Sequence, residues 1–190
     1  LNAGSLTSTG DTAGATAIGW RATATAERAQ AFGHLASASG VRSTAVGEDA
    51  AAQGAGSVSL GNEAVAGGAN DTVAIGNQAN AGLNSATAVG GQANAAGLGS
   101  TSIGWQSAAT AERAQAFGHL AKATGVRATA VGEAAIGQGA GSVALGNEST
   151  AGGTNSIAIG NGASAAGDNQ IALGNAGQLQ ASTATQSGGT

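Results

Sequence analysis

The chain has 190 residues, of which 35 are glycine and only four are aromatic, and it contains no proline, cysteine, methionine or tyrosine. Alanine supplies most of the apolar residues and buries little area, which argues against an ordinary globular core of large side chains. A net charge of −4 with a single lysine leaves no basic patch for nucleic acid, and the lack of cysteine excludes disulfides and thiolate metal sites.

A triplet of a small residue, a larger apolar residue and glycine recurs twelve times along the chain. Its glycines lie 14 residues apart, except for one step of 15 from Gly61 to Gly76. A short fixed period of this kind indicates a stacked repeat in which each unit contacts only its neighbours. The larger apolar residues of the triplets are, in chain order, Ile18, Phe32, Val46, Leu60, Ile75, Val89, Ile103, Phe117, Val131, Leu145, Ile159 and Leu173.

Within one unit, positions are counted from the triplet glycine as zero. The larger residue at −1 and Thr, Val, Ile or Gln at −3 alternate with Ala or Ser at −2, as they would along a strand. Alanine recurs at +3 and +5, and glycine usually occupies +7. We therefore predict an all-β fold, a parallel β-roll (a β-solenoid) whose 14-residue coils each contain two strands of about five residues and two tight turns.

Residues 25–31 are the one stretch with strong helix propensity, and Thr25 could cap such a helix. The stretch nevertheless stays in phase with the repeat, because Phe32 falls where Ile18 and Val46 fall. Register outweighs propensity, so a strand and a turn are expected here too.

Size decides which residues face inward. Only small groups fit between two closely opposed strands, so alanine at −2, +3 and +5 is expected inside and the −1 and −3 residues outside. A long apolar stripe at −1 would then need covering, and burial against copies of itself in a homotrimer would cover it. The twelve triplet residues named above are the expected trimer interface, and Gln30 and Gln115 at −3 suit such a seam. The opposite arrangement, with the large residues inside each roll, stays open.

A longer repeat lies on top of the short one. Residues 110–121 repeat residues 25–36 almost letter for letter, at an offset of 85 residues. We expect a β-roll domain over residues 1–176, containing a duplicated six-unit block at about 20–104 and 105–174. Residues 177–190 are expected to form an irregular tail or the start of a connector, and the start at Leu1 suggests a piece of a longer protein.

The segments Ser142–Asn147 and Ser156–Asn161, with their 14-residue phase, resemble the head repeat of YadA-like trimeric autotransporter adhesins, over about residues 14–176. The resemblance implies a left-handed parallel β-roll trimer that stands on the surface of a Gram-negative bacterium and binds host extracellular matrix or a cell-surface receptor. It also implies cell adhesion and virulence without enzymatic activity or a cofactor. No stalk heptads or neck sequence are recognisable, so attachment to the outer membrane is implied only through segments absent from this chain.

Stacking would make residues at equal positions of successive units neighbours. At position +1, His34 then lies one coil from Glu48, and His119 one coil from Glu133. Such a pair could belong to a metal or acid–base site, but no third ligand or nucleophile is suitably spaced, and a flat roll has no deep pocket. A surface hydrogen bond near a turn is therefore expected, with no catalytic or metal site.

The two tryptophans also fall at +1, in each case one unit before a histidine. Exposed aromatic side chains beside arginine are frequent contact hot spots, although a tryptophan could equally cover a loop or pack across the trimer. The candidate ligand contacts are Trp20, Arg21, His34, Trp105 and His119.

Two further sets are expected to be structural. Charged residues recur as Glu27, Arg28 and Arg42 and again as Glu112, Arg113 and Arg127. They suggest ion pairs that are either solvated or formed between subunits, and a direct role in adhesion is the alternative.

Asparagines after the triplet glycine are expected to form ladders that satisfy backbone groups of the turns. They are Asn62, Asn77, Asn147, Asn161 and Asn175.

Three other functions compete with adhesion. An ice-binding solenoid needs a flat face of regularly spaced threonine, but the −3 threonines give way to Gln, Val and Ile. A purely structural β-solenoid spacer remains an alternative. A left-handed β-helix acyltransferase would use six-residue units and coils of about 18 residues, which the 14-residue step argues against.

Overall fold

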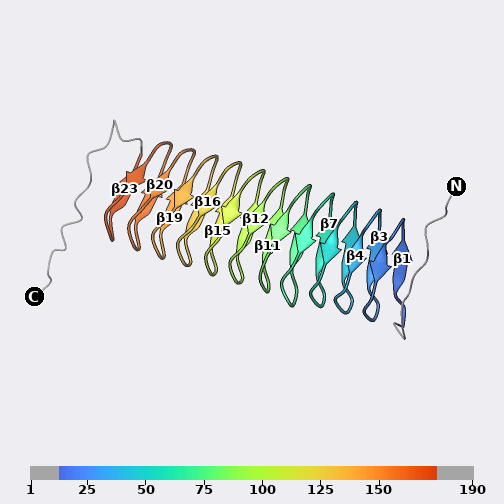
Figure 1. The fold of residues 1–190 in the computed structure, drawn as a ribbon. Coiled ribbons are helices and arrows are strands. Elements are labelled where there is room, and N and C mark those ends of the chain that lie inside the picture. Colours follow the sequence, from blue (N-terminus) through green and yellow to red (C-terminus); the bar gives the residue numbers. More distant parts are fainter. Residues whose placement is uncertain (1–12, 175–190) are drawn as a thin grey trace, which may run out of the picture.

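The structure, a computed structural model, describes residues 13–174 of the 190-residue chain. Over this range the fold is all-β and contains no helix, so it also contains no helix long and apolar enough to cross a membrane. Flat coils stack along one axis into a rod, with the first coil at one end and the last coil at the other (Figure 1). The parallel β-solenoid expected from the 14-residue period is confirmed, whereas the predicted tail at 177–190 lies outside the described residues.

Each coil contributes one strand to each of two parallel sheets. The 12-stranded sheet contains β1 (Thr16–Ile18), β3 (Gln30–Phe32), β5 (Thr44–Val46), β7 (Val58–Leu60), β9 (Val73–Ile75), β11 (Thr87–Val89), β13 (Thr101–Ile103), β15 (Gln115–Phe117), β17 (Thr129–Val131), β19 (Val143–Leu145), β21 (Ile157–Ile159) and β23 (Ile171–Leu173). The 11-stranded sheet contains β2 (Thr23–Ala24), β4 (Ser37–Ala38), β6 (Ala51–Ala52), β8 (Val65–Ala66), β10 (Asn80–Ala81), β12 (Asn94–Ala95), β14 (Ala108–Ala109), β16 (Lys122–Ala123), β18 (Ile136–Gly137), β20 (Thr150–Ala151) and β22 (Ser164–Ala165).

Strand register follows the sequence period. Ile18 pairs with Phe32, which in turn pairs with Val46. The single 15-residue step does not break the ladder, because Leu60 still pairs with Ile75. A bridge between Ala55 and Asn70 lies beside this step, so the extra residue is taken up in the turn and the strands keep their alignment.

The strands are shorter than predicted, with three and two residues in place of about five. The reason is that each coil turns sharply twice, and each turn includes a residue with a positive φ. In the turn after the first strand this residue is at +2, for example Arg21 with φ of 56°. In the turn after the second strand it is at +9, for example Arg28 with φ of 57°. The turns after the first strand lie along one edge of the rod, which we call the +2 edge. The turns after the second strand lie along the other edge, which we call the +9 edge.

The triplet glycine is required by both conformation and space. Gly104 has φ of 131°, and a Cβ there would overlap the carbonyl oxygen of Gly118 in the next coil. Side chains rarely adopt such a φ, and the coils leave no room for a methyl group at this corner. The triplet glycine that sets the period is therefore a point of close backbone approach between successive coils.

The core between the two sheets consists almost entirely of alanine. Ala17, Ala22 and Ala24 represent positions −2, +3 and +5 of one coil, and all three are buried. The larger residues at −1 point outward instead: Ile18 is 53% exposed and Leu60 is 44% exposed. Small residues therefore fill each roll as predicted, and the alternative with the large residues inside the roll is wrong.

Small hydroxyl groups complete this core. Ser59 Oγ donates to the carbonyl oxygen of Ala64 at 2.6 Å, and Ser57 Oγ donates to Gly54 at 2.7 Å. The hydroxyls of Ser102 and Ser107 bond to each other at 2.7 Å. At these positions serine can replace alanine because its one polar atom finds a partner within the coil. Four other buried hydroxyls of the described residues have no such partner, those of Ser43, Thr72, Ser142 and Ser156, so small size is the property that all core positions share.

The stretch with helix propensity is not helical. Residues 26–28 form a turn, and β3 starts at Gln30. The backbone N–H of Arg28 bonds to the carbonyl of Ala13 in the preceding coil at 3.1 Å. Bonding between coils has displaced the local i to i−4 bonds of a helix, which confirms the prediction of strand and turn.

Candidate functional site

Five side chains at position +1 stack along the +2 edge and form what we call the first aromatic column: Trp20, His34, Glu48, Asn62 and Asn77. The rings of Trp20 and His34 are stacked, with centroids 4.9 Å apart and planes 13° apart. His34 Nδ1 lies 3.3 Å from Glu48 Oε1. Asn62 Nδ2 donates to Glu48 Oε2 at 3.5 Å, and Asn77 Nδ2 donates to Asn62 Oδ1 at 3.0 Å.

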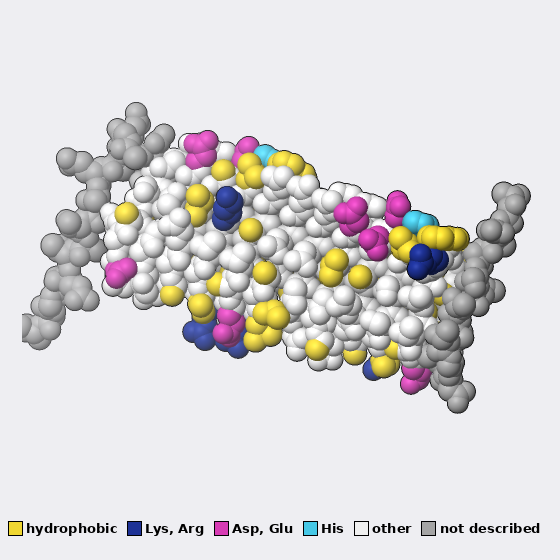
Figure 2. All heavy atoms as spheres, viewed as in Figure 1, with side chains coloured by type: hydrophobic (Ala, Val, Ile, Leu, Met, Phe, Trp, Pro, Cys, Tyr) yellow, Lys and Arg dark blue, Asp and Glu magenta, His cyan; other side chains and the backbone are white. Residues whose placement is uncertain are grey.

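The second aromatic column repeats this arrangement with Trp105, His119, Glu133, Asn147 and Asn161. The rings of Trp105 and His119 are 5.0 Å apart and inclined by 16°. His119 Nδ1 lies 3.4 Å from Glu133 Oε1, Asn147 donates to Glu133 at 3.3 Å, and Asn161 donates to Asn147 at 3.4 Å. In Figure 2 the two histidines appear on the same edge of the rod, each beside hydrophobic and acidic side chains.

The backbone ladder is what brings these side chains together. The coils stack in register, so residues 14 apart follow one another along the rod, and the turn directs position +1 away from the alanine core. Trp20 and Trp105 stay exposed to 52% and 48%. Each column is thus a solvent-facing row in which an aromatic face is followed by an imidazole, a carboxylate and two amides.

The histidine–glutamate pairs are surface contacts. The side chains of His34 and Glu48 are 45% and 62% exposed. Within residues 13–174, no three His, Cys, Asp or Glu side chains gather closely enough to hold a metal ion. Each pair therefore places one imidazole and one carboxylate side by side on the surface of the rod.

One difference between the two columns was not anticipated from the sequence. Arg21 Cζ lies 5.1 Å from the centroid of the Trp20 ring, whereas the residue after Trp105 is Gln106. Gln106 belongs to a row that the sequence analysis missed, which we call the amide column: Glu63, Gln78, Gln92 and Gln106. Gln78 donates to Glu63 at 2.8 Å, Gln92 to Gln78 at 3.2 Å, and Gln106 to Gln92 at 2.6 Å. An alignment of the repeat units shows glutamate or glutamine at position +2 of four successive coils, and this is the signal that could have revealed the row.

The predicted asparagine ladders form, but with different partners. Asn62 and Asn77 bond to each other through their side chains, as do Asn147 and Asn161. They were expected to satisfy backbone groups of the turns, yet the bonds found link side chains of successive coils. Asn175 lies outside the described residues.

The charged sets lie on the opposite, +9 edge. Arg28 Nε is 3.9 Å from Glu27 Oε1, and Arg113 Nε is 3.7 Å from Glu112 Oε1. All four of these side chains are about half exposed or more, so the pairs contribute little to stability. Both are solvated pairs, in line with the expectation for them.

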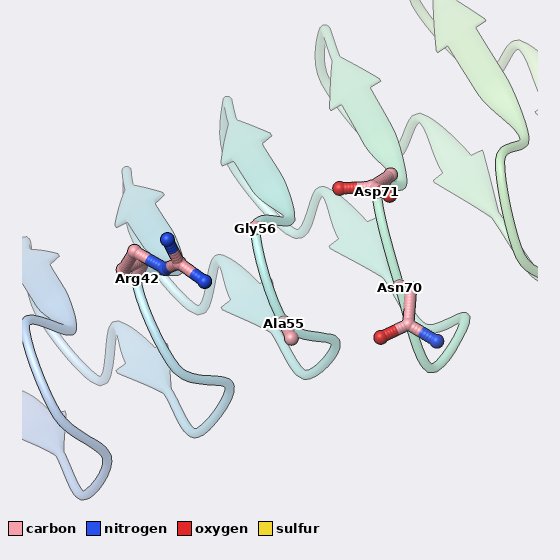
Figure 3. Close-up of a pocket in the computed structure, with 5 residues that line it drawn as sticks. All are labelled: Arg42, Ala55, Gly56, Asn70 and Asp71. Carbon is pink, nitrogen blue, oxygen red and sulfur yellow. The ribbon is translucent and has the colours of Figure 1, made fainter.

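A depression of about 410 Å³ lies beside the first charged set. It is lined by Arg42, Ala55, Gly56, Asn70 and Asp71 (Figure 3). The Asp71 carboxylate reaches back over Gly56, where a Cβ would lie 2.8 Å from its Oδ1. Ala55 and Gly56 have little or no side chain, so this coil leaves a shallow gap between the larger side chains of the neighbouring coils. The gap lies on the +9 edge and is open to solvent.

The apolar stripe predicted as a trimer interface runs along the outer face of the 12-stranded sheet. Five of its members besides Ile18 are more than one-third exposed in the single chain: Leu60, Ile103, Val131, Ile159 and Leu173. The remaining members, Phe32, Val46, Ile75, Val89, Phe117 and Leu145, are half-buried. None of the twelve enters the alanine core.

The profile of the YadA head domain repeat, which spans two copies of the repeat, matches nearly the whole described range. The matched segments are 13–36, 31–50, 38–64, 52–79, 68–93, 84–107, 109–135, 138–163 and 151–176. The chain belongs to the YadA head family. A YadA-like head is a cell-adhesion domain of a trimeric autotransporter, which confirms the resemblance seen in the Ser-Val-Ala-Leu-Gly-Asn type of motif.

Among solved structures, the chain is similar to the collagen-binding domain of the Yersinia adhesin YadA. The two sequences are 25% identical, over 80% of this chain and 76% of that one, with a TM-score of 0.39. No curated protein sequence matches the chain. The assignment of this YadA head therefore depends on its repeat motifs.

Proposed function

We propose that this YadA head is the adhesive part of a bacterial surface protein, and that it binds a host extracellular-matrix or cell-surface molecule through its two aromatic columns. The observation that carries the proposal is the recurrence of one exposed Trp–His–Glu stack, with nearly the same geometry, on one edge of the rod. An exposed tryptophan held in a fixed orientation needs little ordering when it binds, which favours a contact hot spot.

Repetition supports adhesion in a second way. Trp20 and Trp105 are separated by six coils, a distance of about 29 Å at roughly 4.8 Å per coil. A long ligand could contact both columns at once, and the second contact would then benefit from a high effective concentration. Weak individual contacts would add up to firm attachment.

The oligomer that we propose is a homotrimer closed around the apolar stripe. Large apolar side chains along twelve coils form a stripe too long to leave in water, and the alanine core gives a single chain little other apolar burial. The family supplies the expected number of subunits. Three heads would present six aromatic columns, on a protein anchored in the outer membrane by other parts of the autotransporter.

The test is a binding screen of the assembled head against immobilised matrix proteins and cell-surface glycans. Trp20→Ala combined with Trp105→Ala is expected to lower binding to any ligand found at least tenfold, since hot-spot residues contribute more than about 1.4 kcal/mol. Val41→Ala combined with Val126→Ala is the matched control, because these valines are also exposed and six coils apart but lie on the +9 edge. Binding that survives the tryptophan changes would remove the columns from the site, and a head without any ligand would favour the spacer function.

A further inference from the structure

We propose that Trp105 is a receptor for the guanidinium group of an arginine in a host protein ligand, and that the first column fills its equivalent receptor with its own Arg21. The proposal deepens the adhesive function proposed above, on which it rests, by naming the chemistry of the ligand at one of the two columns. It starts from a difference between two tryptophans that share the same histidine and glutamate neighbours.

In the first column the cation is built in. Arg21 Cζ lies 5.1 Å from the centroid of the Trp20 ring, a distance at which a cation is attracted by the electrons of an indole. The planar guanidinium suits this role better than an ammonium because it can also stack on the ring. The protein therefore shows which group the environment of this tryptophan accepts.

In the second column the equivalent position holds Gln106, and its side chain is engaged elsewhere. Its Nε2 donates to Gln92 Oε1 at 2.6 Å, which ties it into the amide column. No cation lies over Trp105 among residues 13–174, although the ring stacks on His119 just as Trp20 stacks on His34. The Trp105 indole is therefore stacked on a histidine as the Trp20 indole is, but no guanidinium group of the described residues lies next to it.

The residue before Trp105 in its column also leaves room. This residue is Gly91, and a Cβ built on it would lie 3.1 Å from Trp105 Cδ1. A glycine thus stands where any side chain would press on the indole, and Trp105 remains 48% exposed. About half of the Trp105 side chain is therefore accessible to a group from outside the chain.

The negative charge along the +2 edge favours a cation as the ligand. Among the described residues, positions +1 and +2 carry one cation, Arg21. They carry five carboxylates: Glu48, Asp49, Glu63, Glu133 and Glu148. Trp105 lies between two of them, three coils after Glu63 and two coils before Glu133. Lys122, at the start of β16, makes no cation–π contact with Trp105. An arginine that reached the indole would thus enter an acidic surface.

The site is tested with the assembled head carrying Trp20→Phe, so that Trp105 is the one tryptophan. Its fluorescence is followed while Gly-Arg-Gly is added at low ionic strength. The control peptide replaces arginine by citrulline, which has nearly the same shape without the charge. We expect the arginine peptide to bind about two- to fivefold more tightly than the citrulline peptide, which is the range of an exposed cation–π contact. Equal affinities would overturn the proposal.

Exchanging the residues that differ between the columns gives a second, independent test. Gln106→Arg should place an internal cation on Trp105 and weaken binding of the arginine peptide. Arg21→Gln combined with Trp105→Phe should open Trp20 and create a site there. Lys122→Ser, which installs the residue of the first block, is the control and should not weaken binding. A Gln106→Arg head that binds the peptide as before would contradict the idea.

Three further outcomes bear on this inference and on the proposed function. If acrylamide fails to quench Trp105 in the free assembly, a sister subunit covers the ring and the receptor does not exist. If Trp105→Ala abolishes attachment to a matrix protein but the arginine peptide neither binds nor competes, the result supports the adhesive function and contradicts the proposed arginine site. If no matrix ligand is found, the peptide titration still decides the receptor.

Discussion

His119 stacks on Trp105 with ring centroids 5.0 Å apart, while its Nδ1 lies 3.4 Å from Glu133. The imidazole is thus held from both sides by residues of neighbouring coils, and it holds the indole in turn. Because all three side chains are exposed, this stack orders the surface more than it stabilises the fold.

His119→Ala should therefore separate binding from stability. We expect the free energy of unfolding to change by no more than about 0.5 kcal/mol, as for most surface substitutions. Ligand affinity should fall because Trp105 loses the ring that orients it. Denaturant unfolding and a binding assay measure the two effects, with Val126→Ala on the +9 edge as the control. A stability loss of several kcal/mol would show that the stack is structural.

Ala88→Val probes the alanine core. Ala88 is completely buried in β11, between sheets that approach closely enough to exclude larger groups. Two extra methyl groups are expected to overpack the coil and destabilise it by about 1–3 kcal/mol. Thermal or denaturant unfolding measures the change. Ala140→Val, at an exposed position, should leave stability nearly unchanged, and equal effects of the two substitutions would contradict a tightly filled core.

Gly104→Ala tests the corner where successive coils meet. A methyl group there would overlap the Gly118 carbonyl and would have to adopt φ of 131°. We expect a loss of about 1–3 kcal/mol or more from the strained backbone alone. Gly82→Ala is the matched control, because its Cβ would meet Ala96 Cα at an ordinary 3.6 Å. If both variants unfold at the same denaturant concentration, the close contact at Gly104 is not limiting.

Val89→Asp tests the trimer. Val89 lies in the middle of the apolar stripe, and an aspartate there would bring three unpaired carboxylates into the proposed seam. Light scattering should report a trimer for the parent head and a smaller species for the variant. Ser164→Asp, on the exposed face of the 11-stranded sheet, should remain trimeric. A Val89→Asp trimer of unchanged stability would exclude this stripe as the interface.

Periodicity made most of the fold predictable, because equal spacing of Gly104 and its counterparts forces equal placement of everything between them. It also correctly overruled the helix propensity of residues 25–31. Strand lengths were overestimated, since the alternation of side chains continues for a residue or two into turns that no longer bond as strands. The boundary depends on backbone angles such as φ of 56° at Arg21, which the residue types at that position do not reveal.

The candidate site was predictable as a set of neighbours but not as an arrangement. Fourteen-residue spacing was enough to bring His34 beside Glu48 and Trp20 beside His34. It could not show that the rings stack, or that Arg21 turns toward Trp20 while Gln106 bonds to Gln92. Those choices depend on side-chain rotamers and local competition between partners, which no repeat pattern encodes. The duplication at 20–104 and 105–174 and the role of each contact residue remain predictions.

The extra residue between Gly61 and Gly76 has a practical consequence. The chain absorbs it at the +9 edge around Asn70, while β7 and β9 stay paired residue for residue. A loop that accepts added length without disturbing its neighbours is a permissive point for grafting. A short epitope or a dye-labelling tag spliced in beside Asn70 would report on the rod from the side opposite its tryptophans.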